Sequence, residues 1–393
     1  MNSTDWDKIY FDNPPVAPLG IIALPGSQTI AAAINRRLIQ QRRKFVESNP
    51  DHAAVHGLLR DSFIISADCP RFETGEGKAV IRETVRGYDV YIIADVGNYH
   101  CTFTMYGMEC PMSPDDHFQD IKRVIAAIGG RARRITVIMP LLYEGRQHRR
   151  QSRESLDCAV ALQELERLGV DNIFTFDAHD PRVQNAIPLT GFNNLLPTYQ
   201  IIRSIVEKER DLEISRGKML VVSPDEGAMS RSIYYASILG LDVSMFYKRR
   251  DYTRIVNGKN PIIQHEYLGE DVEGKDVLIV DDLLSSGEST LDIAQELKRR
   301  KARRIYIAVT FALFVEGIDR FRQAYGDGVI QRVYGTNLTY QRDEVLNEPW
   351  YVSVDMSEFI AYLIDLLNHD RSISALFDPS TKIGKFLKNI RDK

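Results

Sequence analysis

A run of acidic and small hydroxyl residues at positions 280–290 is the segment of the chain best suited to chemistry. Two adjacent carboxylates, Asp281 and Asp282, follow directly on an apolar run. The residues after them leave backbone N–H groups accessible and lead into a helix that we expect to begin near Ser289; they are Ser285, Ser286, Gly287, Glu288 and Ser289. A helix N-terminus binds phosphate, whereas carboxylates accept hydrogen bonds from sugar hydroxyls. The segment therefore predicts a site for a molecule with a phosphate at one end and a diol at the other.

The same residues also have a purely structural interpretation. A Ser-Ser-Gly turn can simply cap a helix, and an Asp-Asp pair can simply end a strand. An apolar strand, a doubled acid and a hydroxyl-rich turn occur together here, and their joint occurrence favours the binding site.

Four other segments carry charged or imidazole side chains after predicted strands. In chain order these side chains are Arg146, Gln147 and Arg149, then His179, then Asp225, and finally Lys248 with Arg250. Each has an ordinary alternative, because a basic run is usually a solvated face, a single histidine is more often structural, and exposed arginines form weak ion pairs. Their shared position favours a site, since ligands of parallel α/β sheets bind at the carboxyl ends of strands.

The elements that must position these residues alternate between apolar strands and amphipathic helices, as in parallel α/β sheets with right-handed crossovers. We expect strands at residues 20–24, 90–94, 135–139, 173–176, 219–222, 243–247, 277–280 and 304–310. We expect helices at residues 28–42, 121–128, 156–168 and 291–299. Residues 249–264 are polar and rich in turn signals, which predicts a long loop.

The strands are numerous enough for two sheets, and a Pro/Gly/Asn-rich stretch at residues 187–197 marks the expected boundary. We predict an N-terminal α/β domain over residues 1–192 and a C-terminal α/β domain over residues 193–350. A helical tail over residues 351–393 should pack back on the domains. Residues 49–68 and 98–114 depart from the alternation.

Composition sets further bounds. The chain has 393 residues, of which 44% are hydrophobic and 26% charged, with a formal net charge of −4. These values fit a globular protein and do not favour nucleic acid or a membrane as the main partner. The four cysteines lack metal-ligand spacing, and we see neither a signal peptide nor an apolar run long enough for a membrane helix. A cytoplasmic location is expected.

Several motifs, in sequence order, resemble one family. The segment at residues 280–290 resembles the phosphoribosyl-diphosphate motif shared by type I phosphoribosyltransferases and ribose-phosphate pyrophosphokinases. The other segments resemble the pyrophosphokinases specifically: Arg71-Phe72-Glu73-Thr74-Gly75-Glu76, Arg146-Gln147-His148-Arg149, Asp177-Ala178-His179, Ser223-Pro224-Asp225 and Lys248-Arg249-Arg250. The resemblance extends from about residue 21 to residue 377.

The resemblance implies two phosphoribosyltransferase-like (type I) domains, each a mostly parallel sheet flanked by helices. It implies transfer of the β,γ-pyrophosphoryl group of ATP to the 1-hydroxyl of ribose 5-phosphate, with Mg²⁺ as cofactor. Phe72, Glu76, Arg146, Gln147 and Arg149 would bind ATP, although Phe72 taken alone would most often be a core residue. The residues of the phosphate–diol segment would bind ribose 5-phosphate.

The remaining roles implied by the resemblance concern catalysis and assembly. Lys248, Arg250 and His179 would be catalytic, and His179 and Asp225 would hold the metal. The physical logic is independent of the family, because phosphoryl transfer depends on positioning and on neutralising phosphate charge. The resemblance also implies a homo-oligomer, commonly a hexamer built from dimers, in which Phe72 and Glu76 serve a neighbouring subunit.

Four positions depart from the family pattern. His148 and Thr74 each replace an aspartate, Ser285 replaces a third aspartate of the sugar loop, and Glu288 replaces a small residue. These departures keep a second hypothesis open, a non-catalytic regulatory homologue that binds nucleotide or sugar phosphate. A third hypothesis, a phosphoribosyltransferase acting on a nucleobase, ranks lowest because it has no need of the segments around Arg146 and His179.

Overall fold

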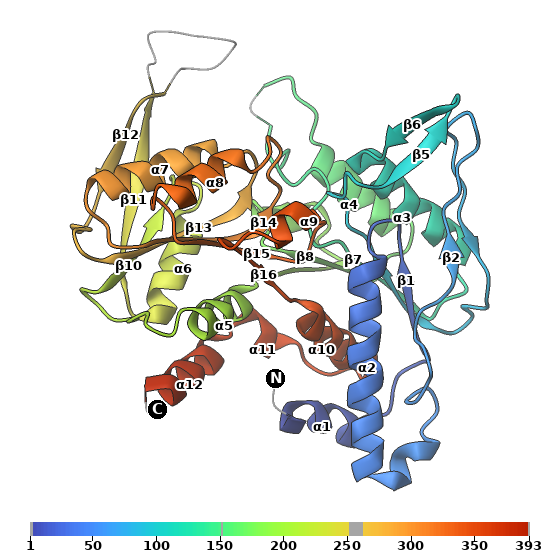
Figure 1. The fold of residues 1–393 in the computed structure, drawn as a ribbon. Coiled ribbons are helices and arrows are strands. Elements are labelled where there is room, and N and C mark those ends of the chain that lie inside the picture. The colour runs from blue at the N-terminus through green and yellow to red at the C-terminus, as the bar shows by residue number, and fades with distance from the viewer. Residues whose placement is uncertain (1–2, 151, 251–261, 392–393) are drawn as a thin grey trace. The chain divides into compact units, whose positions relative to one another are not determined.

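The computed structural model describes residues 3–150, 152–250 and 262–391, and its chain forms two compact units (Figure 1). Unit 1 comprises Met1–Leu196, Leu338–Tyr340 and Asp355–Phe377, and unit 2 comprises Pro197–Asn337, Gln341–Val354 and Asp378–Lys393. The chain therefore passes between the units several times. The domain limits predicted above, at residues 192 and 350, stay predictions.

Unit 1 is built on a five-stranded sheet in the order β1-β4-β7-β8-β9, in which every pair is parallel. Its strands are β1 (Leu19–Ala23), β4 (Asp89–Ile93), β7 (Arg134–Ile138), β8 (Asn172–Phe176) and β9 (Gly191–Leu195). Its helices are α1 (Ser3–Asp12), α2 (Gln28–Ser48), α3 (Pro114–Ile128), α4 (Asp157–Arg167), α10 (Ser357–Asn368) and α11 (Ser374–Phe377). Two short 3₁₀ helices, η1 (Pro50–Ala54) and η2 (Pro181–Ala186), and two hairpins, β2 (Ala67–Asp68) with β3 (Val80–Ile81) and β5 (Thr102–Met105) with β6 (Met108–Pro111), complete it.

Unit 2 is built on a seven-stranded sheet in the order β12-β11-β10-β13-β14-β15-β16, parallel except for β12. Its strands are β10 (Met219–Ser223), β11 (Asp242–Arg250), β12 (Ile262–Leu268), β13 (Asp276–Leu284), β14 (Ile305–Ala312), β15 (Arg332–Thr336) and β16 (Tyr351–Val354). Its helices are α5 (Thr198–Lys208), α6 (Met229–Leu239), α7 (Glu288–Arg299), α8 (Asp319–Gly326), α9 (Asp343–Leu346) and α12 (Ser380–Arg391). Two mainly parallel sheets flanked by helices confirm the predicted fold class.

Both faces of the central strands of the unit 2 sheet are buried, which explains why β10 and β14 are almost wholly apolar. Along β13, Val277 and Ile279 pack with residues of α7 and α8, whereas Leu278 and Val280 pack with residues of α5 and α6. Figure 1 shows the same arrangement, with α7 and α8 on one face of the sheet and α5 and α6 on the other. Side chains alternate between the two faces of a strand, so a run of apolar residues supplies both cores.

The structure corrects two sequence-based expectations in unit 2. The strand expected at residues 277–280 continues to Leu284, because β14 supplies backbone partners as far as Ala312. The loop expected at residues 249–264 has strands at both ends, since Arg249 pairs with Gln264 in the antiparallel β11–β12 ladder. Residues 251–261 lie outside the described residues. Nowhere in the described chain is there a helix both long and apolar enough to cross a membrane.

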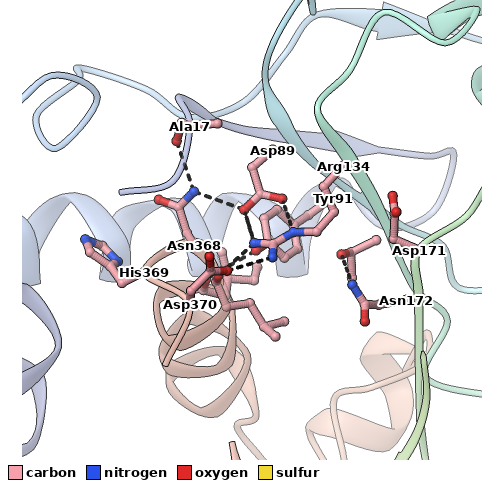
Figure 2. Close-up of polar contacts among 12 residues, drawn as sticks. Ala17, Asp89, Tyr91, Arg134, Asp171, Asn172, Asn368, His369 and Asp370 are labelled. Carbon is pink, nitrogen blue, oxygen red and sulfur yellow. Dashed lines mark hydrogen bonds and ion pairs between the residues drawn. The ribbon is translucent and has the colours of Figure 1, made fainter. Parts of the chain in front are cut away.

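A buried polar network lies at the amino ends of the unit 1 strands (Figure 2). Asp89, the first residue of β4, is fully buried. Arg134, the first residue of β7, donates to both of its carboxylate oxygens, at 2.8 and 2.7 Å. Tyr91 and Asn368 each donate a further hydrogen bond to Asp89 Oδ2, at 2.8 and 3.0 Å. Since a buried charge is tolerated only when it is paired and hydrogen-bonded, these donors are what permits Asp89 at this position.

Asn368 extends the network to a second buried ion pair. Its side-chain oxygen accepts a hydrogen bond from Arg42 of α2 (2.9 Å), and Arg42 also binds Asp365 of α10 (2.9 Å from Nε). Tyr10 of α1 donates to the same carboxylate. Helices from both ends of the sequence are thereby joined to the central strands of unit 1 through polar contacts rather than through apolar packing alone.

We expect Arg134→Met to lower the free energy of unfolding by about 3 kcal/mol, because it leaves the Asp89 charge buried without its main partner. Urea unfolding followed by circular dichroism measures this change. Arg43→Met is the matched control, since Arg43 pairs with the fully exposed Asp61 at 3.0 Å and such surface pairs contribute little to stability. Equal losses in the two variants would contradict the structural role given to the network.

His369 gives this region a defined pH dependence. The ring is fully buried, and burial lowers its pKa below the usual value of about 6.5. Below the usual pKa of about 6.5, the imidazole is protonated in the unfolded chain before it is protonated in the native protein. The free energy of unfolding therefore falls as the pH falls from about 7. Unfolding midpoints measured between pH 7.5 and 5.5 should decline less steeply in His369→Gln than in the wild type. His56→Gln, at an exposed position, should leave the slope unchanged, and an equal flattening in this control would contradict the assignment.

Candidate functional site

The strand order of unit 2 reverses between β10 and β13. After β10 the chain adds β11 on one side, and the sheet then grows through β13, β14 and β15 on the other side. Ligands of open α/β sheets bind outside the carboxyl ends of the two strands that flank such a reversal. The carboxyl end of β10 leads into Asp225, and that of β13 carries Asp281 and Asp282. The topology therefore brings together two segments that the sequence singled out separately.

The two acids of β13 share one cation. Arg231, in the first turn of α6, lies 3.6 Å from Asp281 Oδ1 and 3.8 Å from Asp282 Oδ2. Burial raises the pKa of Asp281 well above its usual value, and the charges of Asp282 and Asp225 add to the effect, whereas Arg231 opposes it. Ionising both acids is therefore costly in the free protein, and hydroxyl donors of a ligand would relieve that cost.

The turn after β13 has the shape that the phosphate prediction requires. Gly287 precedes α7 in the left-handed region, at φ +80°, and a Cβ there would lie 2.3 Å from Phe321 Cζ, so only glycine fits. Gly287 has no side chain to cap α7, and the Glu288 N–H donates a long hydrogen bond to Ser286 Oγ at 3.4 Å. The backbone N–H groups at the start of the helix are thus positioned to receive an anion. Ser285 and Ser286 are half-buried beside them.

In unit 1, the segments after β7 and β8 meet at the carboxyl edge of the sheet. His148 Nε2 lies 3.6 Å from Asp180 Oδ2, and the rings of His148 and His179 are 5.4 Å apart. Arg182 holds the Asp180 carboxylate with two parallel contacts, and this hydrogen bonding lowers the pKa of Asp180 to about 2. The structure therefore places the predicted residue His179 beside the segment of Arg146 to Arg149.

The predicted nucleotide-binding residues at positions 146–149 differ in how accessible their side chains are to a ligand. Arg146 and Arg149 are exposed. The Gln147 amide donates to the carbonyl of Ser155 at 2.7 Å, so it holds its own loop. Tyr143 stacks on Phe118 and donates to Asp115 at 2.7 Å.

Phe72 and Glu76 face each other across a tight turn. The Phe72 N–H donates to the Glu76 carbonyl at 2.7 Å. Phe72 is 52% exposed, and the Lys78 ammonium lies 5.4 Å from the centroid of its ring, so a planar ligand could stack on the ring opposite Lys78. Thr74, which replaces an aspartate of the family pattern, donates to the Glu76 carboxylate at 2.9 Å. Arg71 anchors the turn through a two-pronged ion pair with the buried Asp120 of α3 (2.8 and 2.9 Å).

The other predicted residues are described only in part. Lys248 and Arg250 belong to β11, but their side chains lie outside the described residues. His179 and Asp225 lie in different units, so their shared role in metal binding stays a prediction. Within the described residues, no three His, Cys, Asp or Glu side chains form a group that could hold a metal ion. Asp225 Oδ1 accepts the Ala228 N–H at 3.2 Å, which fixes one carboxylate at the carboxyl edge of unit 2.

Sequence reasoning missed two residues at these edges. Arg231 could have been predicted from the sequence, because the helix that follows a strand places its first turn at the carboxyl edge of the sheet. Asp95 directly follows the strand predicted at residues 90–94, so its position at a strand end was a signal available in the sequence. Its buried carboxylate accepts hydrogen bonds from Thr339 Oγ1 (3.0 Å) and the Tyr340 N–H (2.7 Å), and burial raises its pKa to about 6.

Asp95 lies at a second reversal of strand order. A parallel bridge between Ile21 and Ile64 adds residues 63–65 outside β1, so the order of unit 1 also reverses, between β1 and β4. At this edge, the hydroxyl and N–H donors come from residues 338–340 of the same chain.

Comparison with known proteins bears on both units. Residues 19–169 match the model for the N-terminal domain of ribose phosphate pyrophosphokinase, and residues 192–320 match that for the phosphoribosyl transferase domain. The chain belongs to the ribose-phosphate pyrophosphokinase family. It is a divergent member: it is 28% identical to the ribose-phosphate pyrophosphokinase of Vibrio parahaemolyticus over 79% of this chain and 91% of the relative. For that of Haemophilus ducreyi the identity is 29%, over 80% and 91%.

A solved structure supports the family fold. The phosphoribosylpyrophosphate synthetase of Mycobacterium smegmatis superimposes with a TM-score of 0.68, over 90% of this chain and 99% of that one. The two sequences are 19% identical. The family expected from the motifs is thus confirmed, and so is its two-domain fold.

The raised pKa of Asp281 predicts that this acid costs stability at neutral pH. A folded-state pKa above the unfolded value makes the native state less stable as the pH rises through that interval. Asp281→Asn should therefore raise the free energy of unfolding by about 1 kcal/mol at pH 7.5, and the gain should disappear near pH 4. Asp292→Asn, on the exposed side of α7, is the control and should change little. A less stable Asp281→Asn at pH 7.5 would rule out the proposed electrostatic cost.

Proposed function

We propose that this chain is an active ribose-phosphate pyrophosphokinase, which converts ATP and ribose 5-phosphate into AMP and 5-phosphoribosyl 1-diphosphate. The observation that carries the proposal is the Asp281–Asp282 pair at the strand-order reversal of unit 2, followed by the Gly287 turn and the N-terminus of α7. Family membership supports the same reaction.

Ribose 5-phosphate would bind with its phosphate at the backbone N–H groups of residues 285–289 and its hydroxyls toward Asp281 and Asp282. The phosphate oxygens would then accept hydrogen bonds from N–H groups, and the sugar hydroxyls would donate to carboxylates. Arg231 neutralises part of the acidic charge, which limits repulsion between the acids and the sugar phosphate.

ATP would bind through unit 1. Arg146 and Arg149 are exposed cations suited to the phosphates, and His179 lies at the next strand end. Phe72 would stack on the base, with Glu76 beside it. We propose that this turn serves a neighbouring subunit of a homo-oligomer.

The reaction is an in-line displacement at the β-phosphorus of ATP. The 1-hydroxyl oxygen of the sugar forms the new bond to phosphorus, the bond to the α,β-bridging oxygen breaks, and the hydroxyl proton passes to solvent. Lys248 and Arg250 would stabilise the charge that develops on the transferring group. Bound Mg²⁺ would neutralise phosphate charge, and Asp225 supplies the kind of oxygen ligand it prefers.

One observation favours a second candidate, a non-catalytic homologue. The imidazole of His148 lies against Asp180 and His179, where the family pattern has a carboxylate. Such a homologue would bind ATP or ribose 5-phosphate and form no product.

An AMP-formation assay with ATP, Mg²⁺ and ribose 5-phosphate tests the proposal. We expect AMP only when the sugar phosphate is present, and a roughly 100-fold lower kcat for Lys248→Ala because it loses one cation at the transferring group. Lys301→Ala is the control, since Lys301 pairs with the surface residue Glu273 at 2.8 Å. Absence of turnover with any nucleoside triphosphate, in a folded sample, would refute the activity. Calorimetric binding in that sample would then identify the non-catalytic homologue.

A further inference from the structure

An ion pair lies at the N-terminus of α7, beside the proposed phosphate site. Glu288 is the first residue of that helix, and Arg320, from the first turn of α8, lies 3.3 Å from its carboxylate. Both side chains are more than half exposed, at 58% and 55%. Surface pairs of this kind are weak and exchange partners readily.

Arg320 is held at this place by its neighbour in the chain. Phe321 is fully buried and fills the space beside Gly287 that a Cβ would need. The Val315 N–H, a few residues earlier, donates to the Ser285 carbonyl at 3.0 Å. The backbone at Arg320 is thus fixed against the phosphate loop, while its guanidinium remains able to change partners.

The positive electrostatic potential at the N-terminus of α7 acts on the Glu288–Arg320 pair. The N-terminus of α7 favours an anion, and the Glu288 carboxylate is an anion beside it. A bound phosphate would bring a second negative charge to the same place. The planar guanidinium of arginine binds phosphate through two parallel hydrogen bonds, so Arg320 has a stronger partner once the phosphate arrives.

We propose that Arg320 is a further binding residue for the phosphate of the sugar ligand, and that Glu288 retains it beside α7 while the site is empty. This inference rests on the proposed ribose 5-phosphate site. The Glu288 carboxylate then competes with the ligand, and the Glu288 N–H, which donates to Ser286 Oγ at 3.4 Å, would have to change partner to bind phosphate. The affinity for sugar phosphate is set by the balance of these charges.

Calorimetric titration of the full chain with ribose 5-phosphate tests the proposal. Arg320→Gln should weaken binding about tenfold, as expected for the loss of a charge-assisted hydrogen bond. Glu288→Gln should strengthen binding severalfold. Arg322→Gln is the matched control, because Arg322 lies two residues further along α8 and pairs with Asp319 and Glu348 (2.9 and 2.6 Å); it should bind like the wild type.

The double variant separates direct contact from simple screening. If Arg320 contacts the phosphate, Arg320→Gln also weakens binding about tenfold in the Glu288→Gln background. If Arg320 only screens Glu288, its removal has no effect in that background, and the proposal is overturned. Absence of ribose 5-phosphate binding by the wild type would refute the proposed site itself, whereas normal binding with no effect of Arg320→Gln would refute this inference alone.

Discussion

The buried carboxylate of Asp89 is the constraint on which much of unit 1 depends. A charge without exposure to solvent must be compensated by donors, and here the donors come from the next strand (Arg134), from the same strand (Tyr91) and from helix α10 (Asn368). Sequence segments hundreds of residues apart must therefore assemble before this charge is stable. Asp89 and Arg134 are the first residues of adjacent strands, so the network also sets where those strands begin.

Unit 2 has a similar buried ion pair at the start of a strand. Asp276 is the fully buried first residue of β13, and arginines 303 and 304, just before β14, bind its carboxylate. In each unit the acid opens the strand on one side of the reversal and the arginine comes from the next strand in the sheet. The equivalence is structural, since no internal repeat is visible in the sequence. Parallel strands thus divide the roles, with structural ion pairs at the amino ends and candidate ligand groups at the carboxyl ends.

The sequence allowed the local features to be predicted. The alternation of strands and helices, the turn at residues 285–287 and the start of α7 all follow from nearby residues. Features that depend on long-range pairing could not be predicted in this way. The strand at Asp281 continues because β14 lies beside it, residues 63–65 join a sheet through a single bridge, and residues 338–340 belong to unit 1 although their neighbours in sequence belong to unit 2. Arg231 reaches the two acids only because α6 and β13 are adjacent in space.

We propose that the strand-order reversal of unit 2 binds a sugar phosphate at the end of β13. Backbone amide hydrogen exchange, measured with and without ribose 5-phosphate, tests it directly. The account predicts slower exchange at residues 285–290 in the presence of the ligand, where the N–H groups bind phosphate. Unchanged exchange in this segment, together with protection elsewhere in the chain, would contradict it.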